Sequence, residues 1–236
     1  MNFNAFLITF ISGIAFYIGY LIPRLFVDKK RLIVFSIGFS FSILIGLSLF
    51  DLLPECFELI DNWYMIILYI IIGILILKAF DLLLPNHEHS HSSKHIEHIS
   101  LISCIALLLH NIIEATAIYT TGLNDIRMGV LMAIGVSCHN IPLGVQITSL
   151  TKSSKRAFIM ITLLALSSII GIILLQLFNI VLTDNLIGVL MGITLGMLVY
   201  LIFFELFCEV KDNIKTKEMF YGIFFGIAVI VLSSIL

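Results

Sequence analysis

The chain has 236 residues, of which 60% are hydrophobic and only 12% are charged, and its mean hydropathy is +1.15. A soluble domain is close to half apolar and a quarter charged, and one of this length could not bury so much apolar surface. These values exclude a soluble enzyme and a disulfide scaffold, and the net charge of −2 argues against a nucleic-acid partner.

Eight apolar runs are each long enough to cross a lipid bilayer as a helix, which takes about 20 residues. We therefore expect an all-α, polytopic bundle of about eight transmembrane helices, forming a single domain over residues 1–236. The first run is expected to stay in the protein, because it lacks a basic leading segment and a small-residue cleavage site. The expected spans are 3–22, 32–52, 63–84, 99–120, 129–149, 157–183, 186–207 and 219–236.

The second and seventh runs end in carboxylates with the same four-residue spacing. Asp51 and Glu55 lie in FDLLPECFE, and Glu205 and Glu209 lie in FFELFCEVKD. Because these helices cross in opposite directions, their matching ends fall on opposite faces and indicate an inverted repeat. The four acids are predicted to attract a cation at the entrance and exit, although ordinary charged helix ends would show the same pattern.

Between the third and fourth runs, residues 87–98 read HEHSHSSKHIEH and hold five of the seven histidines. Pro85 and three serines indicate a flexible loop over 85–98. Short histidine-rich tracts bind metals through neutral imidazoles, so weak metal capture is predicted here; the alternative is a polar linker. The loop ligands would be His87, His89, His91, His95 and His98.

The fourth and fifth runs carry the titratable side chains that lie farthest from the span ends: His110, Glu114 and His139. At 1.5 Å per residue, each histidine lies about 15–16 Å into a core of about 30 Å, near its midplane. The connection between the two runs is short, so the helices form an antiparallel hairpin. The two imidazoles are therefore expected to face each other.

His110 and Glu114 are four residues apart and share one helix face. Asn111 and Asn140 add amide oxygens at the same depth, and Pro142 frees a backbone carbonyl one turn back. An ionisable group in hydrocarbon costs roughly 2.5–3.5 kcal/mol, which makes it a candidate functional group. This ligand set suits Zn²⁺ and also Fe²⁺, Mn²⁺ or Co²⁺. The alternative is a His–Glu hydrogen bond that only joins two helices.

The basic residues predict the orientation in the membrane. In this sequence 12 of the 13 lysines and arginines fall in or beside the connections after the first, third, fifth and seventh runs, and only Arg127 falls on the other side. Connections rich in lysine and arginine stay in the cytosol. Both termini are therefore expected outside, and the histidine-rich loop inside.

Four segments resemble the motifs of the ZIP family of divalent metal transporters. HNIIEA at 110–115 resembles the fourth-span HNxPEG motif, and HNIPLG at 139–144 resembles the fifth-span HNIPEG motif. DLLPE at 51–55 and MLVYLIFFELFCE at 197–209 resemble the second- and seventh-span motifs. The histidine-rich loop is also typical of the family, and the resemblance covers nearly the whole chain.

The resemblance implies a 3+2+3 arrangement of eight helices, often as a homodimer, that imports Zn²⁺ or a related ion across the cell membrane. It implies neither an enzyme activity nor a bound cofactor, since the metal is cargo. Two positions depart from the family pattern: Leu143 replaces the fifth-span glutamate, and Gly171 stands near the expected sixth-span glutamate. The implied transport site consists of His110, Asn111, Glu114, His139 and Asn140.

The sequence therefore predicts a metal importer that binds one ion between His110, Glu114 and His139, while a second ion bridged by the two asparagines is disfavoured. The loss of two carboxylates favours an alternative, a metal-sensing membrane protein with a degenerate transport site. An intramembrane metalloprotease would need a pattern such as HExxH, which neither motif provides.

Overall fold

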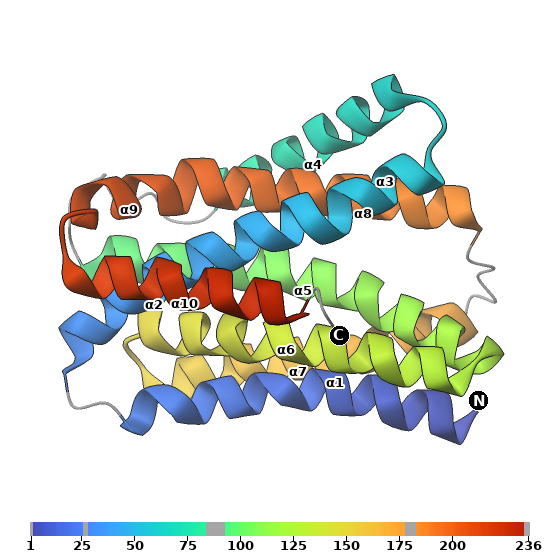
Figure 1. The fold of residues 1–236 in the computed structure, drawn as a ribbon, viewed down its shortest axis with the longest axis horizontal. Helices are drawn as coiled ribbons and strands as arrows, with labels where there is room; N and C mark the ends of the chain where they lie inside the picture. The colour runs from blue at the N-terminus through green and yellow to red at the C-terminus, as the bar shows by residue number, and fades with distance from the viewer. Residues whose placement is uncertain (1, 26–27, 84–92, 178–182, 234–236) are drawn as a thin grey trace.

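The computed structural model describes residues 2–25, 28–83, 93–177 and 183–233. In these ranges the chain forms long helices that lie side by side, without a strand among them (Figure 1). Seven helical stretches of the described chain are long and apolar enough to cross a membrane. The prediction of a polytopic helical membrane protein is thus confirmed. The stretches are Phe3–Leu25, Lys30–Leu59, Trp63–Leu83, Ile96–Asn124, Ile126–Leu150, Ser154–Leu177 and Asp184–Asn213.

The predicted eighth span corresponds to α10 (Lys217–Ser233), of which 17 residues are described. This helix is shorter than the seven spanning stretches, the shortest of which has 21 residues, so the eighth span stays a prediction. The residues after Ser233 lie outside the described part of the chain.

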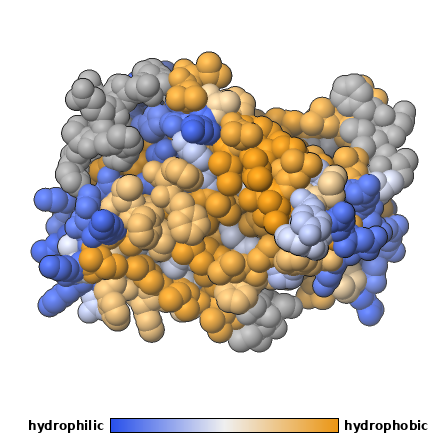
Figure 2. Space-filling model, turned by 90° about the horizontal axis from the view of Figure 1, so that it is seen from above, coloured by the Kyte–Doolittle hydropathy of each residue, from blue (hydrophilic) through white to orange (hydrophobic). Residues whose placement is uncertain are grey.

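The face of the molecule seen in Figure 2 is banded in the way that a membrane requires. In Figure 2 a broad hydrophobic zone crosses the middle, and hydrophilic residues gather at the two ends. Helix α4 (Trp63–Leu83) contributes outward-facing aliphatic side chains such as Ile67, Ile71 and Leu75. Trp63 and Tyr64 are exposed at its first turn, where amphipathic rings meet the membrane–water boundary.

The second span is longer than the apolar run predicted. It comprises α2 (Lys29–Gly46), a π-helical segment Leu47–Leu52 and α3 (Leu53–Leu59), so the helix continues past residue 52. Pro54 looks like a helix end in the sequence, but it lies in the first turn after the π segment. A proline has no backbone N–H, but in the first turn of α3 no hydrogen bond within that helix depends on it. The wide π turn also leaves room between the proline ring and the backbone carbonyl one turn earlier.

The seventh span repeats this construction. It comprises α8 (Asp184–Tyr200), a π-helical segment Leu201–Leu206 and α9 (Phe207–Asn213). Each π segment is six residues long, and its fifth residue is the acid that the sequence singled out: Asp51 in one and Glu205 in the other. A π turn inside a helix is rare and often marks a functional position, so two in the same register are a specific similarity.

The remaining helices are α1 (Phe3–Leu21), α5 (Ser93–Asn124), α6 (Ile126–Leu150) and α7 (Ser154–Leu177), and a short 3₁₀ turn, Ile22–Leu25, follows α1. Helix α1 packs on α6 and α7 packs on α5, while α2 packs on α10 and α8 packs on α4. The two halves of the chain correspond in these contacts. If α1, α2 and α4 trade places with α7, α8 and α10 in that order, and α5 with α6, the same four helix pairs result. The pairing is what an inverted repeat requires, and the 3+2+3 arrangement stays a prediction that it supports.

Glycines allow the central helices to pack closely. A Cβ atom at Gly144 of α6 would lie 2.6 Å from the carbonyl oxygen of Phe16 in α1, and Gly19 of α1 stands opposite. In the outer pair, Gly196 of α8 meets the backbone of α4 at Ile70. Small residues at such crossings let membrane helices gain van der Waals contact. The Gly19–Gly144 crossing holds α6 of the α5–α6 hairpin against α1.

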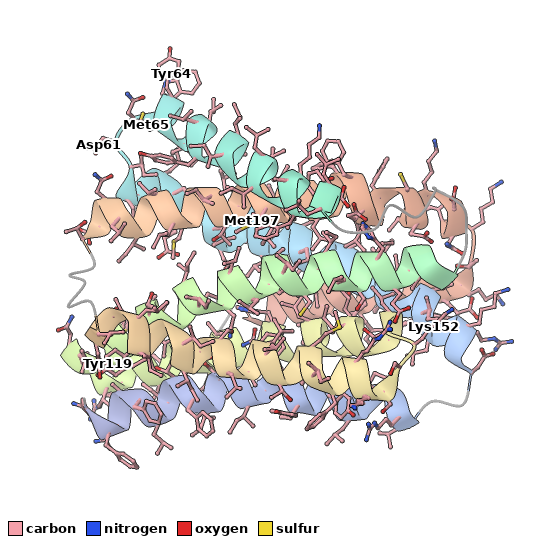
Figure 3. All side chains as sticks on the ribbon, turned by 180° about the vertical axis from the view of Figure 1, so that it is seen from behind. Asp61, Tyr64, Met65, Tyr119, Lys152 and Met197 are labelled. Carbon is pink, nitrogen blue, oxygen red and sulfur yellow. The ribbon has the colours of Figure 1, made fainter. Side chains whose placement is uncertain are left out.

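The basic connections gather at one end of the bundle. The α1–α2, α6–α7 and α9–α10 connections lie at the left of Figure 1, and the α3–α4 and α5–α6 connections lie at the right. Accordingly, Figure 3 places Lys152 at one end and Asp61 and Tyr119 at the other. That the basic end faces the cytosol, with both termini outside, stays a prediction.

Candidate metal centre

The centre is built on the hairpin of α5 and α6. Asp125 caps the N-terminus of α6, and its carboxylate accepts hydrogen bonds from the backbone N–H groups of Arg127 (2.8 Å) and Met128 (3.4 Å). This cap satisfies orphan donors of the first turn and starts the helix directly after α5 ends. The two helices then pack along each other and bring the HN motifs to the same level.

His110, Glu114 and His139 converge on one point, as the sequence predicted. The Nε2 atom of His110 lies 3.2 Å from one oxygen of Glu114, and the Nε2 atom of His139 lies 3.1 Å from the other. The imidazole ring centroids are 6.1 Å apart. One ligand atom from each residue lies within 4.8 Å of the others, so the three side chains can hold a metal ion.

The three side chains are buried, with exposed fractions of 1% for His110, 8% for Glu114 and 9% for His139. A carboxylate in such a place needs a nearby positive charge, because desolvation otherwise costs several kcal/mol. The Nε2 atom of His110 lies 3.2 Å from the Glu114 carboxylate and has no other polar partner among the described residues. A buried nitrogen that faces a carboxylate in this way is suited to a metal ion.

The two asparagines hold the helices around this point. The Nδ2 atom of Asn111 donates to the hydroxyls of Ser167 (2.6 Å) and Ser168 (2.9 Å) and to a carbonyl of α7. The Nδ2 atom of Asn140 donates to the carbonyl of Ser12 in α1 (3.2 Å) and to the Oδ1 atom of Asn111 (3.4 Å). The Oδ1 atom of Asn140 has no partner among the described residues, which leaves one buried amide oxygen for a cation.

The two departures from the family pattern have a clear physical setting. Leu143, one turn after His139, is fully buried and extends the apolar core beside the site. A Cβ atom at Gly171 would lie 2.7 Å from the carbonyl oxygen of Ile112, so α7 is too close to α5 there for a longer side chain. Oxygen atoms from α7 instead reach Asn111 from Ser167 and Ser168, one turn earlier, and the sequence did not single out either serine.

Asp51 and Glu55 lie on the second span, outside the α5–α6 hairpin. Asp51 is in the π segment and Glu55 is in the helix after it. Their carboxylates interact electrostatically with the centre, Asp51 with His139, Glu114 and His110, and Glu55 with Glu114. Asp51 is exposed, and its π segment packs on α2, α3 and α8, so it is not part of the buried ligand set.

At the basic end of the bundle, Glu205 belongs to a second cluster, with Asp81 of α4 and His98 of α5. The sequence associated His98 with the loop and Glu205 with a helix end, and it missed Asp81 and the neighbouring Tyr200. Their separation along the chain hides the cluster, and only the packing of α4, α5 and α8 brings the residues together. Glu209 is also buried.

The predicted histidine-rich loop is described only in part. Helix α5 begins at Ser93, so residues 93–98 form its first turns, and His98 is the only loop histidine whose side chain is described. The side chains of His87, His89, His91 and His95 lie outside the described residues. Metal capture by this loop therefore stays a prediction.

Comparison with known proteins identifies the family. Residues 84–234 match the family model for the ZIP zinc transporters. The zinc transporter ZupT of Streptococcus mutans is 27% identical to this chain over 196 residues, which cover 73% of the chain and 74% of that relative. The ZupT proteins of Chlorobaculum parvum and Chlorobium chlorochromatii are each 26% identical, over 72% and 71% of this chain and 73% and 72% of their own lengths. With its two HN motifs paired at one buried centre, and with most of its length matching the family model, the chain belongs to the ZIP family.

Proposed function

We propose that the chain imports a divalent metal ion, with zinc as the preferred cargo, through the centre formed by His110, Glu114 and His139. The observation that carries the proposal is the convergence of two imidazoles on one buried carboxylate, with no other polar partner for the His110 Nε2 atom among the described residues. Two nitrogen ligands and one carboxylate suit zinc, and a water molecule or the Oδ1 atom of Asn140 would complete a four-ligand set. The named relatives are zinc transporters.

The route through the protein follows the two π segments. The π segment of Asp51 lies toward the end of the bundle that we assign to the exterior, and that of Glu205 lies toward the basic end that we assign to the cytosol (Figure 1). A carboxylate on each side raises the local cation concentration and lets the ion exchange water for protein oxygen in steps. Because the helix contacts are those of an inverted repeat, the two halves can open the centre to alternate sides of the membrane.

The preference for zinc over iron or manganese rests on the ligand types. Imidazole nitrogen favours the later transition metals, whereas Mn²⁺ favours oxygen ligands. We therefore expect unlabelled Zn²⁺ to compete with uptake of labelled zinc more strongly than Fe²⁺ or Mn²⁺ does. Stronger competition by Mn²⁺ would show that oxygen ligands dominate the path.

One observation favours a second function, a metal sensor. Leu143 and Gly171 leave the centre with a single carboxylate, so it could bind an ion without moving it.

Zinc uptake by cells that express the wild type or Glu114→Ala tests the import proposal, and we expect uptake above background only for the wild type. Equal uptake by both would exclude transport through this centre. A sensor would bind zinc in purified form and give no uptake in either case.

A further inference from the structure

A pocket of about 440 Å³ lies at the basic end of the bundle, where the chain turns from α1 to α2 and from α6 to α7. It is lined by the end of α1 and the turn after it, by the last turn of α6, and by the first turns of α2, α5 and α7. Lys152, which Figure 3 labels at this end, is among the lining residues. The volume is in the range of small-molecule sites, about 300–1,000 Å³.

The pocket lies at the level where membrane helices meet lipid headgroups. Two apolar spans end beside it and two begin beside it: Phe3–Leu25, Ile126–Leu150, Lys30–Leu59 and Ser154–Leu177. Aliphatic side chains of α2 and α5, such as Ile33 and Ile96, form part of its wall. A ligand in this place can therefore hold a charged group in the pocket and extend hydrocarbon along the spans.

The charge of the pocket is one-sided. Arg24 and Lys152 line it, and none of its described lining residues is acidic. Arg31 and Arg156, the other arginines at this end, each form an ion pair with an acid. No carboxylate in the described part of the chain pairs with Arg24 or Lys152. The pocket thus holds two positive charges for which the described residues supply no counter-ion.

Arg24 is held in a fixed position by its neighbours. Its guanidinium carbon lies 4.1 Å from the centre of the Tyr20 ring, and its Nη2 atom donates to the Tyr20 hydroxyl and to Oγ of Ser154 (3.0 Å). A guanidinium has five N–H donors, so others remain for an anion. An arginine that is oriented in this way suits a phosphate group, because its planar fork can bind two phosphate oxygens at once.

Thr148 and Ser149, in the last turn of α6, add hydroxyl groups that lack a partner. Both residues line the pocket, and their hydroxyl oxygens are buried without a hydrogen bond to any described residue. Buried polar groups are normally paired, as the neighbouring hydroxyls of Ser100 and Thr151 are with each other (2.7 Å). A ligand with several oxygen atoms would satisfy the two unpaired hydroxyls.

We propose that this pocket binds the phosphate group of an anionic phospholipid from the leaflet at the basic end. Arg24 and Lys152 would bind phosphate oxygens, and the hydroxyls of Thr148 and Ser149 would bind the phosphate or glycerol oxygens. The acyl chains would lie along the apolar spans. Basic pockets between membrane helices on the cytosolic side bind such headgroups. Two cations without a counter-ion repel a divalent metal ion, so this site is separate from the metal centre and does not depend on the proposed import.

The alternative is that these basic residues only set the orientation of the protein in the membrane. That role needs positive charges in the connections, but it needs neither a pocket nor a fixed guanidinium nor unpaired hydroxyls. Lys155 carries the same charge in the first turn of α7, is exposed and does not line the pocket. It is therefore the matched control for a charge outside the site.

The test measures lipid binding to the purified full-length protein in a neutral detergent by native mass spectrometry. We expect tight binding of a single dioleoyl phosphatidylglycerol and no comparable binding of dioleoyl phosphatidylcholine. Arg24→Gln and Lys152→Gln should each weaken binding of the anionic lipid about tenfold, as expected when a charge-assisted hydrogen bond is lost. Lys155→Gln should bind it as the wild type does. Equal weakening by Lys155→Gln and Arg24→Gln, or none in either, would overturn the site.

Competition separates a lipid headgroup from a soluble phosphate. Inorganic phosphate and glycerol 3-phosphate, each at millimolar concentration, should leave the bound phosphatidylglycerol in place, because neither gains contact with the apolar spans. Displacement of the lipid by either compound would identify a soluble phosphate as the occupant and would contradict the lipid proposal.

Thr148→Val provides a test that does not depend on removing a charge. The substitution keeps the shape of the side chain and removes the unpaired hydroxyl. Without lipid, its melting temperature should equal or exceed that of the wild type, because an unpaired buried hydroxyl destabilises the fold. Phosphatidylglycerol should raise that temperature less than it does in the wild type, since the variant binds the lipid more weakly. A rise as large as in the wild type would contradict the site.

Discussion

Glu114 is the side chain on which both buried imidazoles converge, and it sets the charge of the centre. The centre contains one carboxylate, so one Zn²⁺ would leave it with a net positive charge. The Asp51 carboxylate interacts electrostatically with all three side chains of the centre, and it would offset part of that charge.

Asn111 is expected to position α7 and not only to supply an oxygen ligand. Asn111→Ala would leave the buried hydroxyls of Ser167 and Ser168 without their donor. Loss of an orienting partner typically lowers metal affinity by about 10–100-fold, and we expect a reduction in that range in zinc binding by the purified protein. Asn124→Ala, at the exposed end of the same helix, is the control and should bind as the wild type does. Unchanged binding in Asn111→Ala would exclude the positioning role.

Restoring the missing fifth-span carboxylate should make folding depend on zinc. Leu143 is fully buried one turn from His139, so Leu143→Glu adds a charge that costs roughly 2.5–3.5 kcal/mol in the membrane core without an ion. We expect a lower melting temperature than the wild type in the presence of a chelator, and a larger rise on addition of zinc. Leu143→Gln controls for size, and an equal zinc response in both variants would argue against a new ligand.

The meeting of the two histidines and the glutamate was predictable from sequence, because these groups at matched depth in a hairpin are costly to bury unless they bind an ion or one another. Its surroundings were not. The Asn111 contact with α7 depends on how that helix crosses α5. The Asp81–His98–Glu205 group joins residues from three separate helices, and no local spacing indicates such a meeting.

At the scale of helices, close crossings hold the hairpin in place. Gly144 and Gly135 lie on the same helix, but a Cβ atom would clash with the α1 backbone only at Gly144, and it would meet nothing within 4 Å at Gly135. The apolar runs predicted which segments become helices. They did not predict which helices meet, because lipid-facing and helix-facing surfaces are both apolar in a membrane.

Gly144→Val should therefore destabilise the protein by about 1–3 kcal/mol, the usual cost of an overpacked contact. Gly135→Val should change the free energy of unfolding by less than that, since the space around it is open. Thermal unfolding in detergent measures both. If Gly135→Val is as damaging as Gly144→Val, loss of helical glycine itself is responsible, and the α1–α6 crossing is not.

For the whole molecule, the positive charges predict a direction of insertion that the fold alone does not give. Lys152 and Asp61 lie at opposite ends of the bundle (Figure 3). In a background without native cysteines, Asp61→Cys should react with a membrane-impermeant thiol reagent in intact cells. Lys152→Cys should react only after the cells are permeabilised. The reverse pattern would invert the topology and turn the proposed importer into an exporter.

One ion is expected to cross the membrane through the centre of His110, Glu114 and His139, and flux into proteoliposomes tests this most directly. A zinc-sensitive dye inside vesicles reports entry of external Zn²⁺ into vesicles that contain wild type, Glu114→Gln or the exposed-acid control Asp184→Asn. We expect the wild type and Asp184→Asn to fill the vesicles at similar rates. Glu114→Gln should be at least about 100-fold slower, because it loses the only charged ligand of the centre. Equal rates for Glu114→Gln and the wild type would contradict transport through this centre.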